Sequence, residues 1–227
     1  MKSSIPRLPD LNRRSFARTN AQTIAQRVAL LRELVPGARA IAEICCGDCS
    51  RQYQAYTREL GVGTFHGLDL EPAIVAANRE KGIECYQGNA LDINVLQRFI
   101  GDDVIFFGPP LSETCDGHRL IDFHDVVPNY GDFIRLLLGE LHYDGLLVCI
   151  CPNSTNPGDI TQLYGEIRTI RPDANLRLIH KSYSTLTGND EITELRLKYV
   201  ELWFSSKLDD LWEAREGQIE LTVHQTI

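Results

Sequence analysis

Two short segments, residues 42–50 and 67–72, constrain the fold more than any other part of the sequence. The first reads A-E-I-C-C-G-D-C-S, an apolar strand pattern that leads directly into a tight turn. The second, G-L-D-L-E-P, ends another apolar strand in an acidic residue. A strand–turn–helix–strand unit with a carboxylate about twenty residues further on is a usual way to hold a nucleoside, through backbone N–H groups and the ribose hydroxyls. Cysteines stand where glycines are expected in the turn.

Apolar strand patterns alternate with helical patterns along most of the chain. We expect strands at residues 40–45, 64–70, 83–87, 103–107 and 145–151, and helices at 21–35, 51–60, 72–81, 92–100, 130–141 and 158–170. Two long strands, 175–183 and 195–205, follow them. The alternation predicts an α/β fold with a doubly wound, mostly parallel sheet and helices on both faces. The closing pair predicts an antiparallel edge.

Charge is distributed unevenly along the 227 residues, whose formal net charge is −8. Residues 1–35 carry seven basic and two acidic residues, so this stretch is +5 and the remainder is −13. We expect a basic arm and helix over residues 1–37 and one domain over 38–227. The acidic body argues against a broad phosphate-binding face. The arm either binds RNA, DNA or another acidic partner, or is simply solvated.

Composition also bears on location and on cysteine chemistry. No apolar run reaches the roughly 18 residues of a membrane span, and the N-terminus lacks the apolar core of a signal peptide, so we expect a cytoplasmic protein with no membrane partner. Seven cysteines in such a chain indicate reduced thiols rather than a disulfide framework. Buried thiols are the simpler explanation, and we predict no metal ligand, although three spacings also occur in metal sites: Cys46-x-x-Cys49, Cys115-x-x-His118 and Cys149-x-Cys151.

With its motifs in this order, the chain resembles the class I (Rossmann-like) S-adenosylmethionine-dependent methyltransferases over residues 38–205. The family's first motif, D/E-x-G-x-G-x-G, matches at Glu43 and Gly47, while Cys45 and Cys49 replace the outer glycines. The resemblance implies a seven-stranded sheet whose last strand is antiparallel, with S-adenosyl-L-methionine as cofactor. It also implies that Glu43, Cys45 and Gly47 contact this cofactor.

Two further motifs extend the resemblance to the nucleoside end of the cofactor. Asp69 matches the carboxylate that binds the ribose hydroxyls, and Leu70 and Glu71 would lie beside the adenine. The third motif, G-D-A in many relatives, stands here as G-N-A. The resemblance implies that Asn89 accepts a hydrogen bond from the adenine amino group and that Ala90 contributes a backbone amide.

The fourth motif concerns the methyl acceptor. Residues 103–111, D-V-I-F-F-G-P-P-L, resemble the N/D-P-P-Y segment of methyltransferases that act on exocyclic or side-chain amines. In those enzymes the Asn or Asp and the first proline carbonyl accept hydrogen bonds from the amine. The resemblance implies cofactor contact by Gly108, a catalytic role for Pro109 and substrate contact by Pro110. Gly108 lacks the side-chain acceptor, and Leu111 lacks the aromatic ring.

The segment that follows is rich in ionisable side chains, at the place where α/β enzymes hold substrates. His118 is the best candidate for a catalytic base because histidine titrates near neutral pH. Asp116 is the second catalytic candidate. Ser112, His124 and Tyr130 are expected to contact the substrate. A surface or structural role is the alternative for each of these residues.

These observations predict S-adenosylmethionine-dependent methyl transfer to a nucleobase, another planar amine or a small metabolite. A non-catalytic protein that binds the cofactor or a partner on the same fold is the alternative, because two glycines and the amine acceptor are replaced. A nicotinamide-dependent oxidoreductase is a third hypothesis. It requires G-x-G-x-x-G, of which the residues from Gly47 onward supply the first glycine alone.

Overall fold

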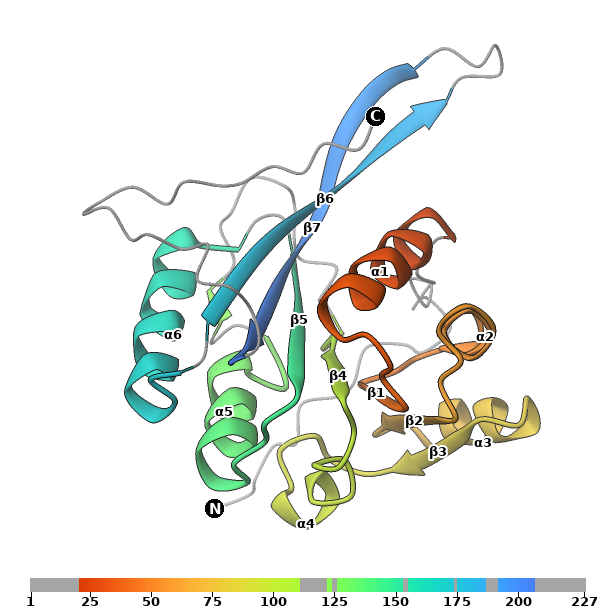
Figure 1. Ribbon diagram of the computed structural model, residues 1–227, viewed down its shortest axis with the longest axis horizontal. Coiled ribbons are helices and arrows are strands. Elements are labelled where there is room, and N and C mark those ends of the chain that lie inside the picture. Colours follow the sequence, from red (N-terminus) through yellow and green to blue (C-terminus); the bar gives the residue numbers. More distant parts are fainter. Residues whose placement is uncertain are drawn as a thin grey trace, which may run out of the picture.

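Seven strands form one mixed sheet in the order β3-β2-β1-β4-β5-β7-β6 (Figure 1). The structure, a computed structural model, describes residues 21–110, 122–123, 126–152, 155–173, 175–186 and 192–206. Neighbouring strands from β1 to β5 are parallel, whereas β7 is antiparallel to β5 and β6, as the sequence predicts. The strands are β1 (Ala40–Ile44), β2 (Thr64–Asp69), β3 (Glu84–Gln87), β4 (Val104–Phe107), β5 (Leu146–Pro152), β6 (Asn175–Leu186) and β7 (Ile192–Ser205).

Helices cover both faces of this sheet, and α5 and α6 lie on the opposite side from α1 and α2 (Figure 1). Within the described ranges, no helix is long and apolar enough to cross a membrane. Two helices, α2 and α5, continue into π-helical turns, η2 and η4. The helical elements are α1 (Ala21–Leu34), α2 (Ser50–Ala55), η2 (Tyr56–Leu60), α3 (Pro72–Glu80), α4 (Ile93–Leu96), α5 (Tyr130–Ile134), η4 (Arg135–Glu140) and α6 (Pro157–Ile170).

Each face of the sheet buries its own apolar core, because successive strand residues point to opposite faces. Ile41 of β1 and Phe106 of β4 belong to the core under α1 and α2, together with Leu31 of α1. Ile44 and Phe107 belong to the core under α5 and α6. Helix α1 therefore shares a core with the sheet, while residues 1–20 of the predicted basic arm lie outside the described residues.

The observed elements differ from the predicted ones mainly at their ends. The helix expected over residues 92–100 is helical only over α4. The N–H groups of Arg98 and Phe99 bond to carbonyls three residues back, which tightens the chain into turns. Strands β6 and β7 are longer than expected because they pair with each other far beyond β5, which pairs with residues 199–204 of β7. The resulting hairpin projects from the body of the protein (Figure 1).

A buried ion pair ties α1 to β7. Arg27 Nε donates to Glu201 Oε1 over 2.7 Å, and the two side chains are 1% and 0% exposed. Trp203 Nε1 donates to the other carboxylate oxygen of Glu201 over 3.0 Å, and the Arg27 guanidinium lies 5.0 Å from the centre of the Phe106 ring. Arg27, one of the seven basic residues counted over residues 1–35, therefore neutralises a core carboxylate.

We expect Arg27→Met to lower the free energy of unfolding by about 3–5 kcal/mol, because it leaves the Glu201 carboxylate buried without its cation. Urea denaturation followed by circular dichroism measures the change. The double variant Arg27→Met/Glu201→Leu should recover most of the loss, since it removes both charges. Arg32→Met on the exposed side of α1 is the matched control, and we expect it to change stability by less than about 1 kcal/mol. Equal losses in the single and double variants would contradict the ion pair.

Candidate functional site

The turn after β1, residues 45–47, has an unusual backbone and is called the β1 turn below. Cys45 has φ +60° and Gly47 has φ +52°, so both lie in the left-handed region that favours glycine. Cys45 thus keeps the backbone conformation of the glycine it replaces, at a cost of about 1–2 kcal/mol. A Cβ built on Gly47 would meet no atom within 4 Å. The space above Gly47 is therefore open, as a turn that holds a ligand requires.

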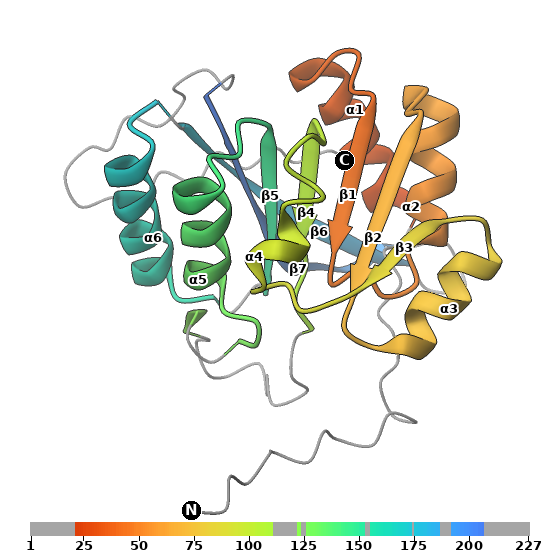
Figure 2. The ribbon, with the colours of Figure 1, turned by 90° about the horizontal axis from the view of Figure 1, so that it is seen from below.

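Asp69 fixes the β1 turn from the neighbouring strand. The register of β1 with β2 pairs Ile44 with Leu68, so Asp69 ends β2 at the level of the turn, and both strands end on the same side of the sheet (Figure 2). Asp69 Oδ2 accepts the Gly47 N–H over 3.0 Å, and Oδ1 accepts the Glu71 N–H over 3.0 Å. Each carboxylate oxygen has a further lone pair, so Asp69 can position the turn and still accept hydrogen bonds from a ligand.

Asn78 of α3 holds the other side of the β1 turn. Its Nδ2 donates to the Gly47 carbonyl over 2.7 Å, and its side chain is buried at 1% exposure. The peptide groups on both sides of Gly47 are thus anchored, by a carboxylate and by an amide. Sequence analysis missed Asn78, because no local pattern links it to a turn 31 residues earlier.

The residues after β2 and β3 form the next part of the same edge. Leu70 is 66% exposed, a high value for a large apolar side chain, while Glu71 begins α3 by accepting the Ala73 N–H with its side chain. After β3, Asn89 is exposed and its Oδ1 accepts the Leu91 N–H over 2.9 Å. The predicted adenine acceptor is therefore already engaged with its own backbone. Ala90 is buried.

Glu43 lies in a buried polar environment between β1 and α2. Its side chain is 6% exposed. Gln52 Nε2 donates to its Oε2 over 3.4 Å, and its Oε1 has no hydrogen-bond partner among the described residues. Burial raises the pKa of Glu43 from 4.5 to about 7, while the positive charge of Arg27 lowers it. The structure thus points Glu43 into the core under α1 and α2, and its predicted cofactor contact stays untested.

The end of β4 brings the fourth motif to the same edge of the sheet. The Gly108 N–H donates to the Ile44 carbonyl over 3.2 Å, so Gly108 lies beside the start of the β1 turn. A Cβ on Gly108 would come within 3.3 Å of Ile150 Cδ1. Pro109 is buried and Pro110 is exposed. The segments that follow β1, β2, β3 and β4 therefore meet at one edge, which we call the carboxyl edge.

Tyr130 is the one predicted substrate contact that the structure places inside the protein. It is 0% exposed, its hydroxyl donates to the Ile150 carbonyl over 2.6 Å, and its ring packs against Phe107 and Phe123. Tyr130 therefore fastens α5 to β5. The four remaining predicted residues of the acceptor site, Ser112, Asp116, His118 and His124, lie outside the described residues.

The cysteines are divided between the two faces of the sheet. Cys46 and Cys49 are buried in the core under α1 and α2, whereas Cys149 and Cys151 are buried in the opposite core. The sheet thus separates these two pairs, and Cys115 lies outside the described residues. In the described part of the chain, no three His, Cys, Asp or Glu side chains are grouped to hold a metal ion.

Substitutions at Cys45 test the strained turn. We expect Cys45→Asn to be nearly as stable as the wild type, because asparagine tolerates a positive φ. Cys45→Val should lose about 2 kcal/mol of unfolding free energy, since a β-branched side chain is a true outlier there. Urea denaturation of the two variants measures the difference. A valine variant as stable as the asparagine variant would show that Cys45 does not adopt this conformation.

The pKa of Glu43 predicts a pH-dependent stability. Between its ordinary value of 4.5 and its folded value of about 7, the folded state binds more protons than the unfolded state. The contribution of Glu43 to stability therefore falls as pH rises through this window. Glutamine does not ionise, so the free energy of unfolding of Glu43→Gln should not fall in this way. Relative to the wild type it should rise by up to about 3 kcal/mol between pH 4.5 and pH 8.

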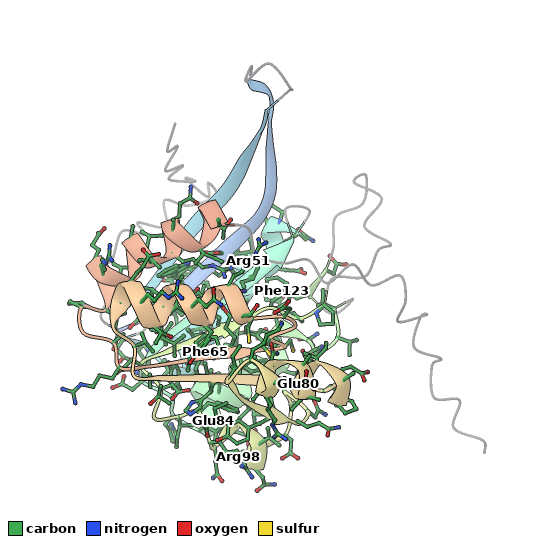
Figure 3. All side chains as sticks on the ribbon, turned by 90° about the vertical axis from the view of Figure 1, so that its right-hand side faces the viewer. Arg51, Phe65, Glu80, Glu84, Arg98 and Phe123 are labelled. Atoms are coloured by element: carbon green, nitrogen blue, oxygen red, sulfur yellow. The ribbon has the colours of Figure 1, made fainter. Side chains whose placement is uncertain are left out.

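The control for Glu43 is Glu80→Gln, on the outer side of α3 (Figure 3). Glu80 is exposed, so its replacement should change the free energy of unfolding little at pH 5 or at pH 8. Unfolding free energies are measured in urea at pH 5 and pH 8. A Glu43→Gln variant that is less stable than the wild type at pH 8 would mean that Glu43 is ionised and paired with Arg27.

No protein-family model and no curated protein matches this sequence. Solved structures do resemble it. The methyltransferase domain of a bacterial Hen1 is 12% identical, with 81% of this chain and 97% of that chain covered and a TM-score of 0.54. The precorrin-6y C5,15-methyltransferase of Geobacter metallireducens is 12% identical, with 82% and 87% covered and a TM-score of 0.52.

The small RNA methyltransferase HEN1 is 14% identical, with 84% of this chain and 25% of that chain covered and a TM-score of 0.53. At such low identity these likenesses concern the fold alone. They agree with a seven-stranded, mostly parallel sheet that has an antiparallel C-terminal strand. The chain therefore has the Rossmann-like fold of the class I S-adenosylmethionine-dependent methyltransferases.

Proposed function

We propose that this protein binds S-adenosylmethionine at the carboxyl edge and transfers its methyl group to an acceptor held near the end of β4. The observation that carries the proposal is the open, left-handed β1 turn, which Asp69 and Asn78 anchor on both sides of Gly47. A turn with this backbone directs its peptide groups toward a ligand at close range.

Three described residues of the carboxyl edge, Gly47, Asp69 and Leu70, support this cofactor. The open space above Gly47 would admit the methionine part close to the backbone. The remaining lone pairs of the Asp69 carboxylate would accept hydrogen bonds from the ribose hydroxyls. The exposed side chain of Leu70 offers an apolar surface for the adenine ring. When bound, the cofactor supplies a methyl group activated by the sulfonium, and the chain aligns the acceptor and excludes water.

The acceptor site would be formed by Gly108, Pro109 and the segment after Pro110. The Pro109 carbonyl is a candidate hydrogen-bond acceptor for an amine, as the fourth motif implies. Gly108 offers no side-chain acceptor, so a base such as His118, assisted by Asp116, would have to supply that function. We propose a nucleobase, another planar amine or a small metabolite as acceptor. The neighbours named as small RNA and precorrin methyltransferases support neither class over the other.

Calorimetric titration tests cofactor binding. We expect the wild-type protein to bind S-adenosylmethionine and not NAD. Asp69→Ala should weaken binding at least about thirtyfold, because it removes two charge-assisted hydrogen bonds to the ribose and releases the β1 turn. The control Asp144→Ala replaces a carboxylate that is 75% exposed and precedes β5, away from the carboxyl edge, and should bind as the wild type does. No binding of S-adenosylmethionine by the wild type would refute the proposal.

Leu70 tests the adenine site without disturbing the turn. Because the side chain is 66% exposed in the free protein, Leu70→Ala should leave the unfolding free energy unchanged. It should weaken cofactor binding about 5- to 20-fold, through the loss of about 1–2 kcal/mol of apolar burial. Ile100→Ala, at another exposed apolar residue that lies before β4, should leave the affinity unchanged. Equal affinities in the two variants would place the adenine elsewhere.

A non-catalytic cofactor-binding protein is the second candidate, and one observation favours it. Gly108 lacks the side-chain acceptor that holds the amine in the amine methyltransferases. The two functions differ in methyl transfer. S-adenosylmethionine labelled in its methyl group, incubated with the protein and with pools of RNA, DNA or metabolites, should label an acceptor if the protein is an enzyme. Tight cofactor binding with no label in any pool would favour the binding protein.

A further inference from the structure

A pair of thiols meets beneath the β1 turn. Cys46 Sγ lies 3.8 Å from Cys85 Sγ, although the two residues are 39 positions apart. Cys46 is the middle residue of the β1 turn, and Cys85 belongs to β3, the edge strand of the sheet. A disulfide bond is about 2.05 Å long, so the sulfur atoms would have to approach by less than 2 Å to bond.

The strand between the two cysteines leaves room for their contact. Gly67 of β2 pairs with Cys85 of β3. A Cβ on Gly67 would lie 3.0 Å from Cys85 Sγ and 3.1 Å from Cys46 Sγ, so a larger residue there would press on both sulfur atoms. The absence of a side chain at Gly67 therefore allows the two sulfur atoms to meet across β2.

Asn78 connects the thiol pair with the β1 turn. Its Nδ2 lies 3.6 Å from Cys46 Sγ and 4.0 Å from Cys85 Sγ, and the same nitrogen donates to the Gly47 carbonyl. Hydrogen bonds from Cys46 and from Asn78 lower the pKa of Cys85. The pKa of Cys46 is raised, by its hydrogen bonds to Cys49 and Cys85 and by burial. Cys85 is therefore the nucleophile of the pair and Cys46 the resolving thiol.

We propose that a peroxide oxidises Cys46 and Cys85 to a disulfide that ties the β1 turn to β3. The Cys85 thiolate attacks one oxygen of hydrogen peroxide and becomes a sulfenic acid, and the released hydroxide takes the Cys46 proton. The Cys46 thiolate then attacks the Cys85 sulfur and displaces the sulfenic oxygen as hydroxide, which takes up the proton that Cys85 had released and leaves as water. Two thiols and one peroxide thus give one disulfide and two waters, and the two electrons pass to the peroxide.

Burial limits which oxidants can take part. Cys85 is 2% exposed and Cys46 is 9% exposed, so a bulky disulfide reagent cannot reach the pair in the folded state. Hydrogen peroxide is small enough to enter through local opening of β3, which spans only Glu84–Gln87 and lies at the sheet edge.

The disulfide also bears on cofactor binding, a consequence that rests on the proposed function. The disulfide would draw Cys46 toward β3 and so displace the middle of the β1 turn. The next residue, Gly47, is held at its N–H by Asp69 and at its carbonyl by Asn78. The oxidised turn can no longer keep the geometry of the reduced one. We expect the oxidised protein to bind S-adenosylmethionine at least tenfold more weakly, and dithiothreitol to restore the affinity.

Peptide mapping of the full-length protein tests the disulfide directly. The reduced protein is treated with hydrogen peroxide, alkylated and digested with trypsin, which releases residues 40–51 and 82–98. We expect one linked pair of these peptides, assigned by fragmentation to Cys46 and Cys85, with the other five of the seven cysteines alkylated. A bond between Cys46 and Cys49, or an alkylated Cys85 after peroxide treatment, would overturn the proposal. The test needs no variant, so it does not depend on a mutant that folds.

Two variants serve as matched controls. Cys85→Ser, in β3, should abolish the linked peptides and keep its cofactor affinity after peroxide treatment. Cys151→Ser, in the opposite core, should form the disulfide as the wild type does. Failure of the proposed function and failure of the proposed oxidation effect give different results. A reduced wild-type protein that binds no S-adenosylmethionine refutes the proposed function, whatever the peptide map shows. A mapped disulfide with unchanged affinity overturns the link between oxidation and binding.

Discussion

The parallel register of β1 with its two neighbours sets the geometry of the whole carboxyl edge. Ile44 pairs with Leu68 of β2 and with Phe107 of β4, so the three strands end at the same level. The residues that follow them therefore leave the sheet side by side. Asp69 can reach the Gly47 N–H, and the Gly108 N–H can reach the Ile44 carbonyl, because of this shared level. A shift of this register by one residue would also turn each side chain of β1 toward the opposite core.

The two faces of the sheet differ in chemistry. The core under α5 and α6 is largely aromatic and aliphatic, with Phe107 stacked on Phe133. The core under α1 and α2 also encloses Arg27, Glu43 and Glu201, three ionisable side chains that are each at most 6% exposed. Buried charges are tolerated only with close partners, so α1 must dock in one position to bring Arg27 to Glu201. Burial raises the pKa of Glu43, and the positive charge of Arg27 lowers it only in part.

Much of the site could be predicted from sequence because its signals are local. The acidic residue after an apolar strand, the proline at the start of α3 and the turn at Gly47 are each visible within a few residues. Cys45 stands at a glycine position of the first motif, but the sequence alone does not reveal its positive φ. Tyr130 was assigned to the substrate because its ring could stack on a planar molecule. Its packing against Phe107 and Phe123 depends on the sheet being closed.

The sequence by itself determined the order of strands and helices along the chain and the places of the β1 turn and of Asp69, because hydrophobic periodicity and turn residues act over a few positions. The tertiary structure alone decided which distant side chains meet. Arg27 and Glu201 are 174 residues apart, and Cys46 and Cys85 are 39 apart. No local pattern encodes such pairs, since they depend on strand order and on which face of the sheet each residue occupies. A residue counted as part of a basic arm thus became a core cation, and two ordinary cysteines became neighbours.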